Sequence, residues 1–314
     1  MNLNYVKEIA KWMQSDRPVA EVREELLNYH DRDIAFAIES LDGAARKKAF
    51  QILDEERLAD VFSYFKDPLE YMDEIGMERF AAIVSDMDSD DAVDVLEELD
   101  DATRRRLAPL LQADARKAIR LIRSYDEDEI GSQMTTNFVR ISQGISVKQA
   151  TRSLILQADK NDNINTIYVS DGERHYVGAI DLKDLITARE YDDLEDIIVS
   201  SYPYVFAEEK IHACVDKIKE YAEDSIPVLD EERRIVGVIT ATDITELVDE
   251  EMGEDYAMLA GMTEASDLDE TTFQSMKKRL PWLILLLFLG MGVSSVVGLF
   301  EQVVAQVALI VCFQ

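Results

Sequence analysis

Apolar residues in the first 124 positions recur every three or four residues, the spacing that places them along one face of an α-helix. The runs ARKKAFQIL, MERFAAIVSDM and DAVDVLEEL show this spacing clearly. The stretches LDGAARKKAFQILDEERLADVF and LDDATRRRLAPLLQADARKAIR each combine a short turn with two such helices. The pattern predicts an all-helical domain over residues 1–130, built from helical hairpins stacked as a superhelix.

From about residue 131 the pattern changes to strands that alternate with helices, and the arrangement occurs twice. The strands TIYVSD and YVGAI of the first unit correspond to SIPVLD and IVGVI of the second. Both units end in glycine, two apolar residues, a polar residue and then, three positions on, aspartate, at Gly178–Asp184 and Gly237–Asp243. Strands rich in valine, isoleucine and tyrosine, each set with its own helices, predict two α/β modules at residues 131–190 and 191–250.

The stretch ATDITELVDEEMGEDYAMLAG, residues 241–261, has helical spacing but an unusual number of carboxylates. Like charges three or four residues apart on a helix repel each other. Either these acids are ordinary solvated charge, or something positive normally lies beside them. Glu251 and Asp255 fall within the apolar face of this helix, where exposed charge is unfavourable, so we expect them to meet a partner surface together with a cation.

Leu280–Phe300 contains no charged residue and follows a connecting segment over residues 251–279. A helix over this uncharged stretch would be about 31 Å long, close to the hydrocarbon thickness of a bilayer, and we predict that it crosses the membrane. The preceding Lys277, Lys278 and Arg279 place residues 1–279 in the cytoplasm by the positive-inside rule. A second apolar run, Val303–Phe313, is too short to span. Residues 280–314 are therefore expected to begin a multi-pass domain in the plasma membrane, of which this sequence is a truncated piece.

The chain has 64 acidic and 33 basic residues and a formal net charge of −31, which argues against a nucleic-acid partner. The two cysteines lie far apart and in no metal-ligand spacing, so no disulfide framework is predicted. His30, His175 and His212 are isolated in the sequence. No pairing of a nucleophile with a base and no phosphate loop is visible, so we do not expect an enzyme.

The repeated modules resemble a tandem pair of cystathionine-β-synthase (CBS) domains. SIPVLDEERRIVGVITATDI is close to the core of that family, and TIYVSDGERHYVGAIDLKDL is similar to it. The resemblance implies two modules docked through their sheets, and dimerisation of the pair. It also implies that an adenine nucleotide such as ATP can bind between the modules, with Asp184 or Asp243 contacting the ribose. CBS pairs without a nucleotide, acting as scaffolds, are the alternative.

The order of the parts, ending in KKRLPWLILLLFLGMGVSSVVGLFE, resembles the MgtE family of bacterial magnesium transporters. The resemblance implies a homodimeric Mg²⁺-selective channel in the membrane, with pore residues beyond Gln314. It implies that the cytoplasmic domains sense Mg²⁺ and that the connecting segment over residues 251–279 is a plug helix linking sensor and pore. Mg²⁺ is typically held by one or two carboxylates and several waters, which suits acids shared between domains.

Matched to the pattern of the MgtE family, the acids expected to bind Mg²⁺ form two groups. The helical domain contributes Asp60, Asp90 and Asp94. The end of the CBS pair and the connecting helix contribute Asp243, Glu246, Glu251, Glu254 and Asp255. Two departures put individual sites in doubt, because Ala222 stands where an acid is common and Gly131-Ser132 where paired glycines are common. Asp90 could instead cap a helix through its carboxylate.

Two other classes of function remain open from the sequence. In the first, the chain is an adenine-nucleotide-sensing CBS module that regulates another membrane protein, and the acids only keep it soluble. In the second, it is a membrane-anchored scaffold that binds partners through the helical domain. A response to ATP but not to Mg²⁺ would favour the first, and a response to neither would favour the second.

Overall fold

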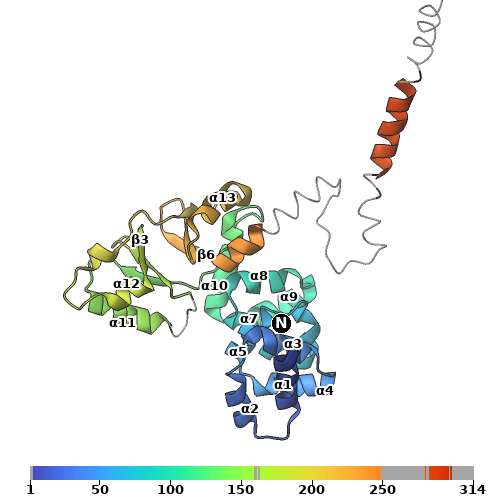
Figure 1. Cartoon of the computed structure of the whole chain (residues 1–314), viewed down its shortest axis with the longest axis horizontal. Coiled ribbons are helices and arrows are strands. Elements are labelled where there is room, and N and C mark those ends of the chain that lie inside the picture. Colours follow the sequence, from blue (N-terminus) through green and yellow to red (C-terminus); the bar gives the residue numbers. More distant parts are fainter. Residues whose placement is uncertain are drawn as a thin grey trace, which may run out of the picture. The chain divides into compact units, whose positions relative to one another are not determined.

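The computed structural model describes residues 3–158, 161, 163–248, 280, 283–296 and 298. The chain divides into two compact units, Met1–Asp243 and Ile244–Gln314, and the first contains both the helical part and the α/β part (Figure 1).

The N-terminal part is helical throughout, as the spacing of apolar residues predicted. Its helices are α1 (Leu3–Gln14), α2 (Val19–Leu26), α3 (Asp31–Glu39), α4 (Gly43–Ile52), α5 (Glu55–Phe62), α6 (Met72–Ile75), α7 (Met77–Asp86), α8 (Ser89–Glu97), α9 (Asp101–Leu107) and α10 (Ala113–Ile122), with 3-10 turns η1 (Pro68–Tyr71) and η2 (Ala108–Leu110). Helices two apart in sequence pack together, α1 on α3, α3 on α5, α5 on α7 and α8 on α10. This regular pairing is consistent with stacked helical hairpins, and the helical N domain is as predicted; the superhelix itself stays a prediction.

Local sequence signals set where these helices begin. Asp42, Asp54 and Asp100 are N-cap residues whose carboxylates accept backbone N–H groups of the first turn. Such caps satisfy donors that the helix cannot pair internally. The buried rings of Phe50, Phe62 and other aromatic residues fill the space between the helices. Some aspartates of this domain therefore cap helices, and others remain as candidate cation ligands. Those that cap helices are excluded as candidate ligands.

Arginine side chains tie successive hairpins together by reaching back to the carbonyl groups that end an earlier helix. Arg79 on α7 donates to the carbonyls of Phe50 (2.5 Å) and Leu53 (2.7 Å) at the end of α4, and to the carboxylate of Glu55 (2.8 Å). Arg104 does the same for the carbonyls that end α8. Because the last four carbonyls of a helix have no partner within it, these contacts replace water where the hairpins pack.

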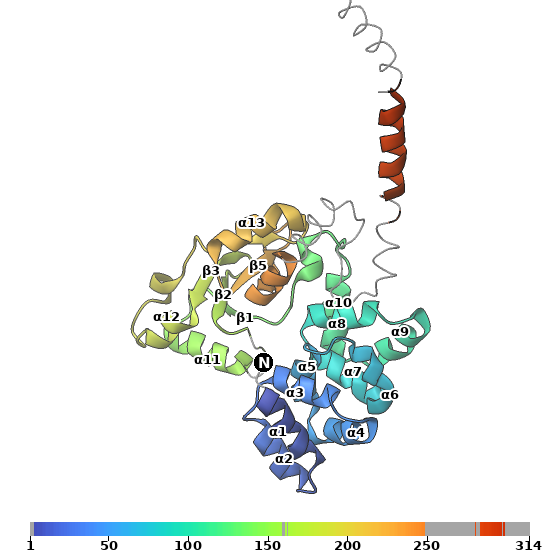
Figure 2. The same ribbon diagram turned by 45° about the vertical axis from the view of Figure 1, so that its right-hand side comes forward.

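The α/β part contains the two predicted modules. The first has β1 (Val139–Ser142), α11 (Val147–Ala158), β2 (Thr166–Ser170), β3 (Tyr176–Asp181) and α12 (Leu182–Thr187). The second has β4 (Val205–Phe206), α13 (Ile211–Tyr221), β5 (Ser225–Leu229) and β6 (Ile235–Thr240), followed by helical residues 241–248. The 3-10 turns η3 (Ile130–Gln133) and η4 (Leu194–Ile197) precede the two modules. Each sheet has three strands, the first two parallel and the last two antiparallel (Figure 2).

The two modules meet through aromatic residues on their sheets. In the first module, one face of the sheet packs against α11 through an aliphatic core. The opposite face carries Tyr168 and Tyr176, which pack with Leu229 and Val238 of the second module. The Tyr168 hydroxyl lies 2.6 Å from the Ser225 hydroxyl, so a buried polar group is satisfied across the junction. This is the sheet-to-sheet docking that the sequence led us to expect.

The glycine of each repeated motif allows another chain segment to approach the last strand of its module. A Cβ on Gly237 would lie 2.8 Å from the Thr135 carbonyl oxygen, and one on Gly178 would lie 2.6 Å from the Val199 carbonyl oxygen. Thr135 pairs with Val238, and Val199 pairs with Ala179. The segment that contains Thr135, before the first module, therefore pairs with the last strand of the second module. The segment that contains Val199, before the second module, pairs with the last strand of the first. Only glycine leaves room for such a close approach.

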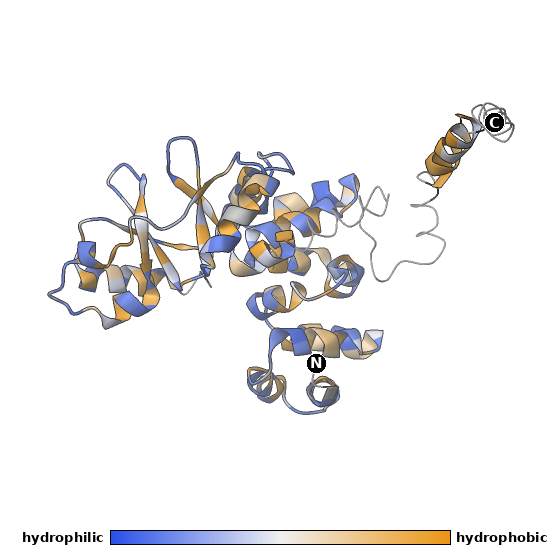
Figure 3. Cartoon of the chain, turned by 45° about the horizontal axis from the view of Figure 1, so that its top comes forward, coloured by the Kyte–Doolittle hydropathy of each residue, from blue (hydrophilic) through white to orange (hydrophobic). Residues whose placement is uncertain are grey.

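Residues 283–296 are helical and carry apolar side chains (Figure 3). Within the described part of the chain, no helix combines the length and apolar character needed to cross a membrane, so the span predicted over Leu280–Phe300 is not found there. The rest of that stretch, the connecting segment over residues 251–279 and the run Val303–Phe313 lie outside the described residues.

Candidate cation site

Helix α8 carries the acids DSDDAVD at its start, and Asp88 rather than Asp90 occupies the N-cap position. Asp88 makes no side-chain capping bond, and its Oδ1 instead accepts a hydrogen bond from Asn137 Nδ2 at 2.7 Å. Acidic residues are favoured at a helix N-terminus because the helix dipole is positive there. The alternative that Asp90 serves as a helix cap is therefore not supported.

Asp90 lies in the first turn of α8, half-buried, and its Oδ1 is buried with no hydrogen-bond partner among the described residues. Burial, followed by the negative charges of Asp243, Asp91 and Asp88, raises the pKa of Asp90 to about 8. A buried carboxylate oxygen without a partner costs free energy unless a proton or a cation occupies the position. Asp90 is thus the predicted site residue whose surroundings most favour a positive ligand.

Asp243 of the second module acts on Asp90 electrostatically, because its negative charge is, after burial, the largest cause of the raised Asp90 pKa. It belongs to a capping box at the start of helical residues 241–248. The Thr240 backbone N–H donates to Asp243 Oδ2 at 2.7 Å, and the Asp243 N–H donates to Thr240 Oγ1 at 3.4 Å. The box fixes the Asp243 carboxylate at the end of β6. The structure therefore brings together two predicted site residues that are far apart in the sequence.

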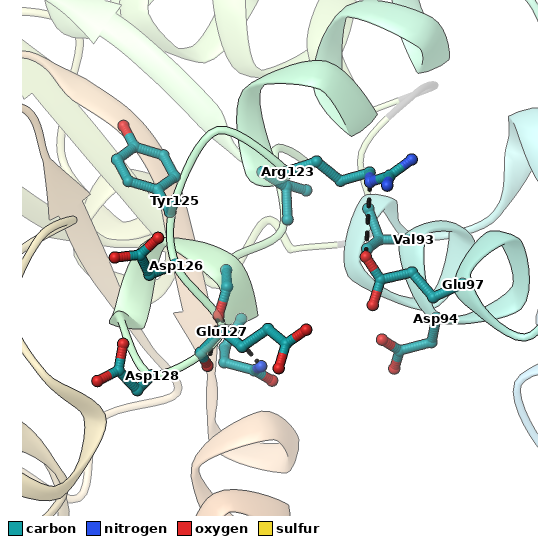
Figure 4. Close-up of a pocket in the computed structure, with 11 residues that line it drawn as sticks. Val93, Asp94, Glu97, Arg123, Tyr125, Asp126, Glu127 and Asp128 are labelled. Carbon is teal, nitrogen blue, oxygen red and sulfur yellow. Dashed lines mark hydrogen bonds and ion pairs between the residues drawn. The ribbon is translucent and has the colours of Figure 1, made fainter.

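Asp94 lines a different place, a cavity of about 590 Å³ between α8 and the segment that follows α10. Figure 4 shows Asp94 and Glu97 on one side of this cavity and the acids of residues 126–128 on the other. Arg123 Nε lies 3.5 Å from Glu97 Oε1 and neutralises part of the charge. Lys210 Nζ lies 2.7 Å from Asp128 Oδ1, so a second carboxylate of the cavity is paired as well. The carboxylates that have no such ion pair make the cavity attractive to cations in solution.

Asp60 is exposed on α5 and lines a second cavity, of about 520 Å³, together with Asp86, Ser89 and Asn137. Burial raises the pKa of Asp86, while a hydrogen bond from Gln112 opposes that shift.

Glu246 is exposed on helical residues 241–248. Glu251, Glu254 and Asp255 lie outside the described residues. The acids predicted in the helical domain thus occupy three separate surroundings.

Within the residues that the structure describes, no group of three or more histidine, cysteine, aspartate or glutamate side chains converges as a metal site. Mg²⁺ nevertheless needs only one or two carboxylates, because it keeps most of its water ligands. Asp90 and Asp243 supply hard oxygen donors, and Asp90 Oδ1 is buried without a partner, so the two carboxylates fit the ion.

The sequence pattern did not single out Asp91, whose pKa is also raised by burial. Spacing alone does not show which acids of DSDD become buried.

Ala222, one of the departures from the family pattern, ends α13 with a left-handed φ of 51° and is exposed. Asp184, one of the two predicted ribose contacts, is exposed in the first turn of α12 and lines none of the three cavities described for the chain. Nothing in the geometry of these two positions adds to the candidate cation site.

The fold and the acids together define an acidic helical domain joined to a CBS pair. A family model for the MgtE intracellular N domain matches residues 29–128, and one for the CBS domain matches residues 128–191 and 194–250. With this domain order and the relatives described next, the chain belongs to the MgtE family.

The magnesium transporter MgtE of Bacillus subtilis (strain 168) is 28% identical over 299 residues, 95% of this chain and 66% of the relative. The chain thus spans slightly under two thirds of that relative's length. A crystal structure of the soluble part of a magnesium transporter has a TM-score of 0.73 at 28% identity, covering 79% of this chain and 98% of that one. The cytosolic domain of the Mg²⁺ channel MgtE in complex with ATP has a TM-score of 0.65 at 28% identity, covering 73% and 95%. The MgtE relatives are transporters rather than enzymes, as expected from the lack of a catalytic motif in the sequence.

Proposed function

We propose that this chain is the regulatory part of a magnesium transporter of the plasma membrane, and that Mg²⁺ controls it by bridging carboxylates of the helical domain and the CBS pair. The observation that carries the proposal is the buried Asp90 oxygen without a partner, on a carboxylate that also senses the negative charge of Asp243 from the CBS pair. Relatives that are magnesium transporters supply the ion. Residues 1–279 lie in the cytoplasm in this proposal, and the plug helix transmits the state of the sensor to the pore.

Electrostatics explains how such a sensor responds. When Mg²⁺ is scarce, Asp90 and Asp243 either repel each other or must share a proton, and the helical domain separates more easily from the CBS pair. When Mg²⁺ is abundant, the ion replaces the proton and attracts both carboxylates. Driving a two-state gate from mostly open to mostly closed needs about 5 kcal/mol of differential binding. Several weak sites acting together, including the cavity beside Asp94, supply that amount, and the transported ion then inhibits its own entry.

The Asp90→Asn, Asp94→Asn double variant should have a flatter response to Mg²⁺ than the parent. Losing two charges makes the closed form easier to reach without metal, and losing two ligands makes Mg²⁺ less effective. Limited proteolysis of the exposed linker at residues 126–128 reports the change, because closure protects it. The parent should become protected as Mg²⁺ rises, and the double variant much less so.

The matched control removes the same charge at two exposed aspartates outside the predicted site, Asp16 and Asp101, by substitution with asparagine. Its protection curve should follow the parent. If the site variant also follows the parent, the acids of α8 are only solvated surface and the proposal is wrong.

Binding of ATP to the CBS pair is a second candidate function, favoured by the related cytosolic domain that was solved with ATP. The CBS resemblance implies that Asp184 or Asp243 contacts the ribose, and this proposal takes Asp184, because the Asp243 carboxylate already accepts the Thr240 N–H in its capping box. A rise in melting temperature with ATP in the presence of EDTA, lost in Asp184→Asn, would support it. If ATP stabilises the chain and Mg²⁺ does not, the protein is instead an adenine-nucleotide sensor.

Exposed apolar side chains on the first CBS module support the predicted homodimer. Leu156 on α11 and Ile186 on α12 are each 70% exposed, and the two helices pack against each other. Burying such side chains contributes about 2 kcal/mol each, so Leu156→Asp with Ile186→Asp should convert a dimer to monomers. Analytical ultracentrifugation measures the change. Leu27→Asp, at a 64% exposed position of the helical domain, is the control and should remain dimeric. A parent that sediments as a monomer, or a double variant that stays dimeric, would contradict this interface.

A further inference from the structure

Hydrogen bonds that involve no cation join the start of α8 to the segment that leads into the CBS pair. Ser89 is 7% exposed, and its Oγ accepts the Thr136 backbone N–H at 2.8 Å and lies 3.1 Å from Thr136 Oγ1. One residue earlier, Asp88 Oδ1 accepts Asn137 Nδ2 at 2.7 Å. A hydrogen-bonded serine that is this deeply buried is a specific contact, because its loss would leave the Thr136 N–H unpaired.

The segment that receives these bonds is itself fixed to the strand that leads to Asp243. Thr135 is fully buried, its N–H donates to the Val238 carbonyl at 2.9 Å, and the Val238 N–H donates back to the Thr135 carbonyl at 2.8 Å. Val238 lies on β6, and β6 ends at Thr240, which forms the capping box with Asp243. A continuous path of hydrogen bonds and backbone thus runs from the first turn of α8 to Asp243.

This path joins the same two elements that the acids tend to separate. Asp88, Asp90 and Asp91 lie at the start of α8, and the charges of Asp243, Asp91 and Asp88 all act on Asp90. The bonds from Ser89 and Asn137 require no metal ion. They oppose separation of α8 from the end of β6 while the charges are uncompensated, and Mg²⁺ then adds to their effect.

We propose that Ser89 and Asn137 form a metal-independent latch, which positions Asp90 beside Asp243 before a cation binds. They are positioning residues, not ligands. A ligand pair that is already in place costs less to assemble, so the latch raises the apparent affinity for Mg²⁺ without contacting the ion. The effect on Mg²⁺ affinity rests on the proposed function, but the latch itself is defined without Mg²⁺.

The direct test is hydrogen exchange on the whole chain in EDTA, read at the Thr136 amide. In the parent this amide should exchange slowly, because its acceptor is Ser89 Oγ. Ser89→Ala should accelerate its exchange about tenfold or more, and Ser89→Thr, which keeps the hydroxyl, should restore protection. Ser124→Ala is the control, since that hydroxyl donates to the nearby Leu121 carbonyl, within its own helix end. Equal protection of Thr136 in the parent and in Ser89→Ala would overturn the latch.

A second test exchanges the donor Asn137 and the acceptor Asp88. It keeps the proposal falsifiable if Ser89→Ala does not fold. Asn137→Asp alone places a carboxylate against Asp88 and should raise the Mg²⁺ midpoint for linker protection about tenfold, or ~1.4 kcal/mol. Adding Asp88→Asn restores one donor and one acceptor at unchanged net charge, and should return the midpoint close to the parent value. A double variant no better than the single one would overturn the latch. If Thr136 is protected through Ser89 but Mg²⁺ has no effect on the parent, the latch stands and the proposed function fails.

Discussion

Replacing Asp90 by asparagine should stabilise the metal-free chain at about pH 8 and change it little at about pH 4. The reason is that burial and the neighbouring acids raise the pKa of Asp90 to about 8 from its ordinary value of 3.8. Between these two values the folded chain keeps the proton on Asp90, whereas the unfolded chain releases it. The folded chain then binds more protons than the unfolded chain, so the contribution of Asp90 to stability falls as pH rises and is fully lost above about pH 8.

The size of the effect follows from about 1.36 kcal/mol for each unit of pKa difference. From about pH 5 to about pH 8 the parent should therefore lose up to about 4 kcal/mol relative to Asp90→Asn, whose side chain cannot ionise. Saturating Mg²⁺ should reverse the order at high pH, because the ion takes the place of the proton on Asp90 and the amide is a weaker ligand.

The measurement is denaturant unfolding of both proteins in EDTA across this pH range, with Mg²⁺ added at the upper end. Acids that do not interact with Asp90 contribute equally to both proteins, so the difference between the two curves reports on Asp90 and the acids coupled to it. Asp16→Asn, at an exposed position, should run parallel to the parent. A difference between Asp90→Asn and the parent that does not change with pH would show that Asp90 is not enclosed with Asp243.

Replacing Arg79 by alanine should destabilise the helical domain by about 3 kcal/mol. The substitution removes the donors for the carbonyls of Phe50 and Leu53 and breaks an ion pair with Glu55. A buried polar group that loses its hydrogen-bond partner costs about 1–3 kcal/mol of folding free energy. Losses of bonds from a charged donor such as arginine lie toward the upper end of that range. The consequence extends to the sensor, because α7 packs against α8 and helps to hold Asp90 in place.

Denaturant unfolding followed by far-UV circular dichroism measures this loss. Arg105→Ala is the matched control, because Arg105 is exposed and has no ion-pair or hydrogen-bond partner among the residues that the structure describes. The control should change stability by less than about 0.5 kcal/mol. If Arg79→Ala is as stable as Arg105→Ala, the reach-back contacts do not hold the hairpins together.

Much of the fold was predictable because it depends on local signals. The three- and four-residue spacing placed the helices of the first domain, and aspartates before apolar runs, such as Asp42 and Asp100, cap them as expected. The repeated motif predicted two modules, and the structure explains its glycines, because Gly178 and Gly237 make room for another backbone segment.

The candidate site was predictable only as a set of acids, because sequence spacing does not report burial or contacts between domains. Asp60, Asp90 and Asp94 were expected as the Mg²⁺-binding acids of the helical domain, but packing gives each of them different surroundings. Asp90 and Asp94 share a helix face by spacing, yet only Asp90 has a buried oxygen without a partner. Ser89 and Asn137 carry no sequence signal, because a serine or an asparagine becomes a specific contact only when tertiary packing excludes water from it.

The most direct test of the account is small-angle scattering from residues 1–279 with and without millimolar Mg²⁺, at matched ionic strength. Bridging of the helical domain to the CBS pair predicts a smaller radius of gyration in Mg²⁺, no equal change in NaCl, and a weaker change in the Asp90→Asn, Asp94→Asn variant. A radius of gyration that Mg²⁺ leaves unchanged, or that NaCl reduces equally, would contradict ion-bridged closure and reduce the role of the acids to screening of surface charge.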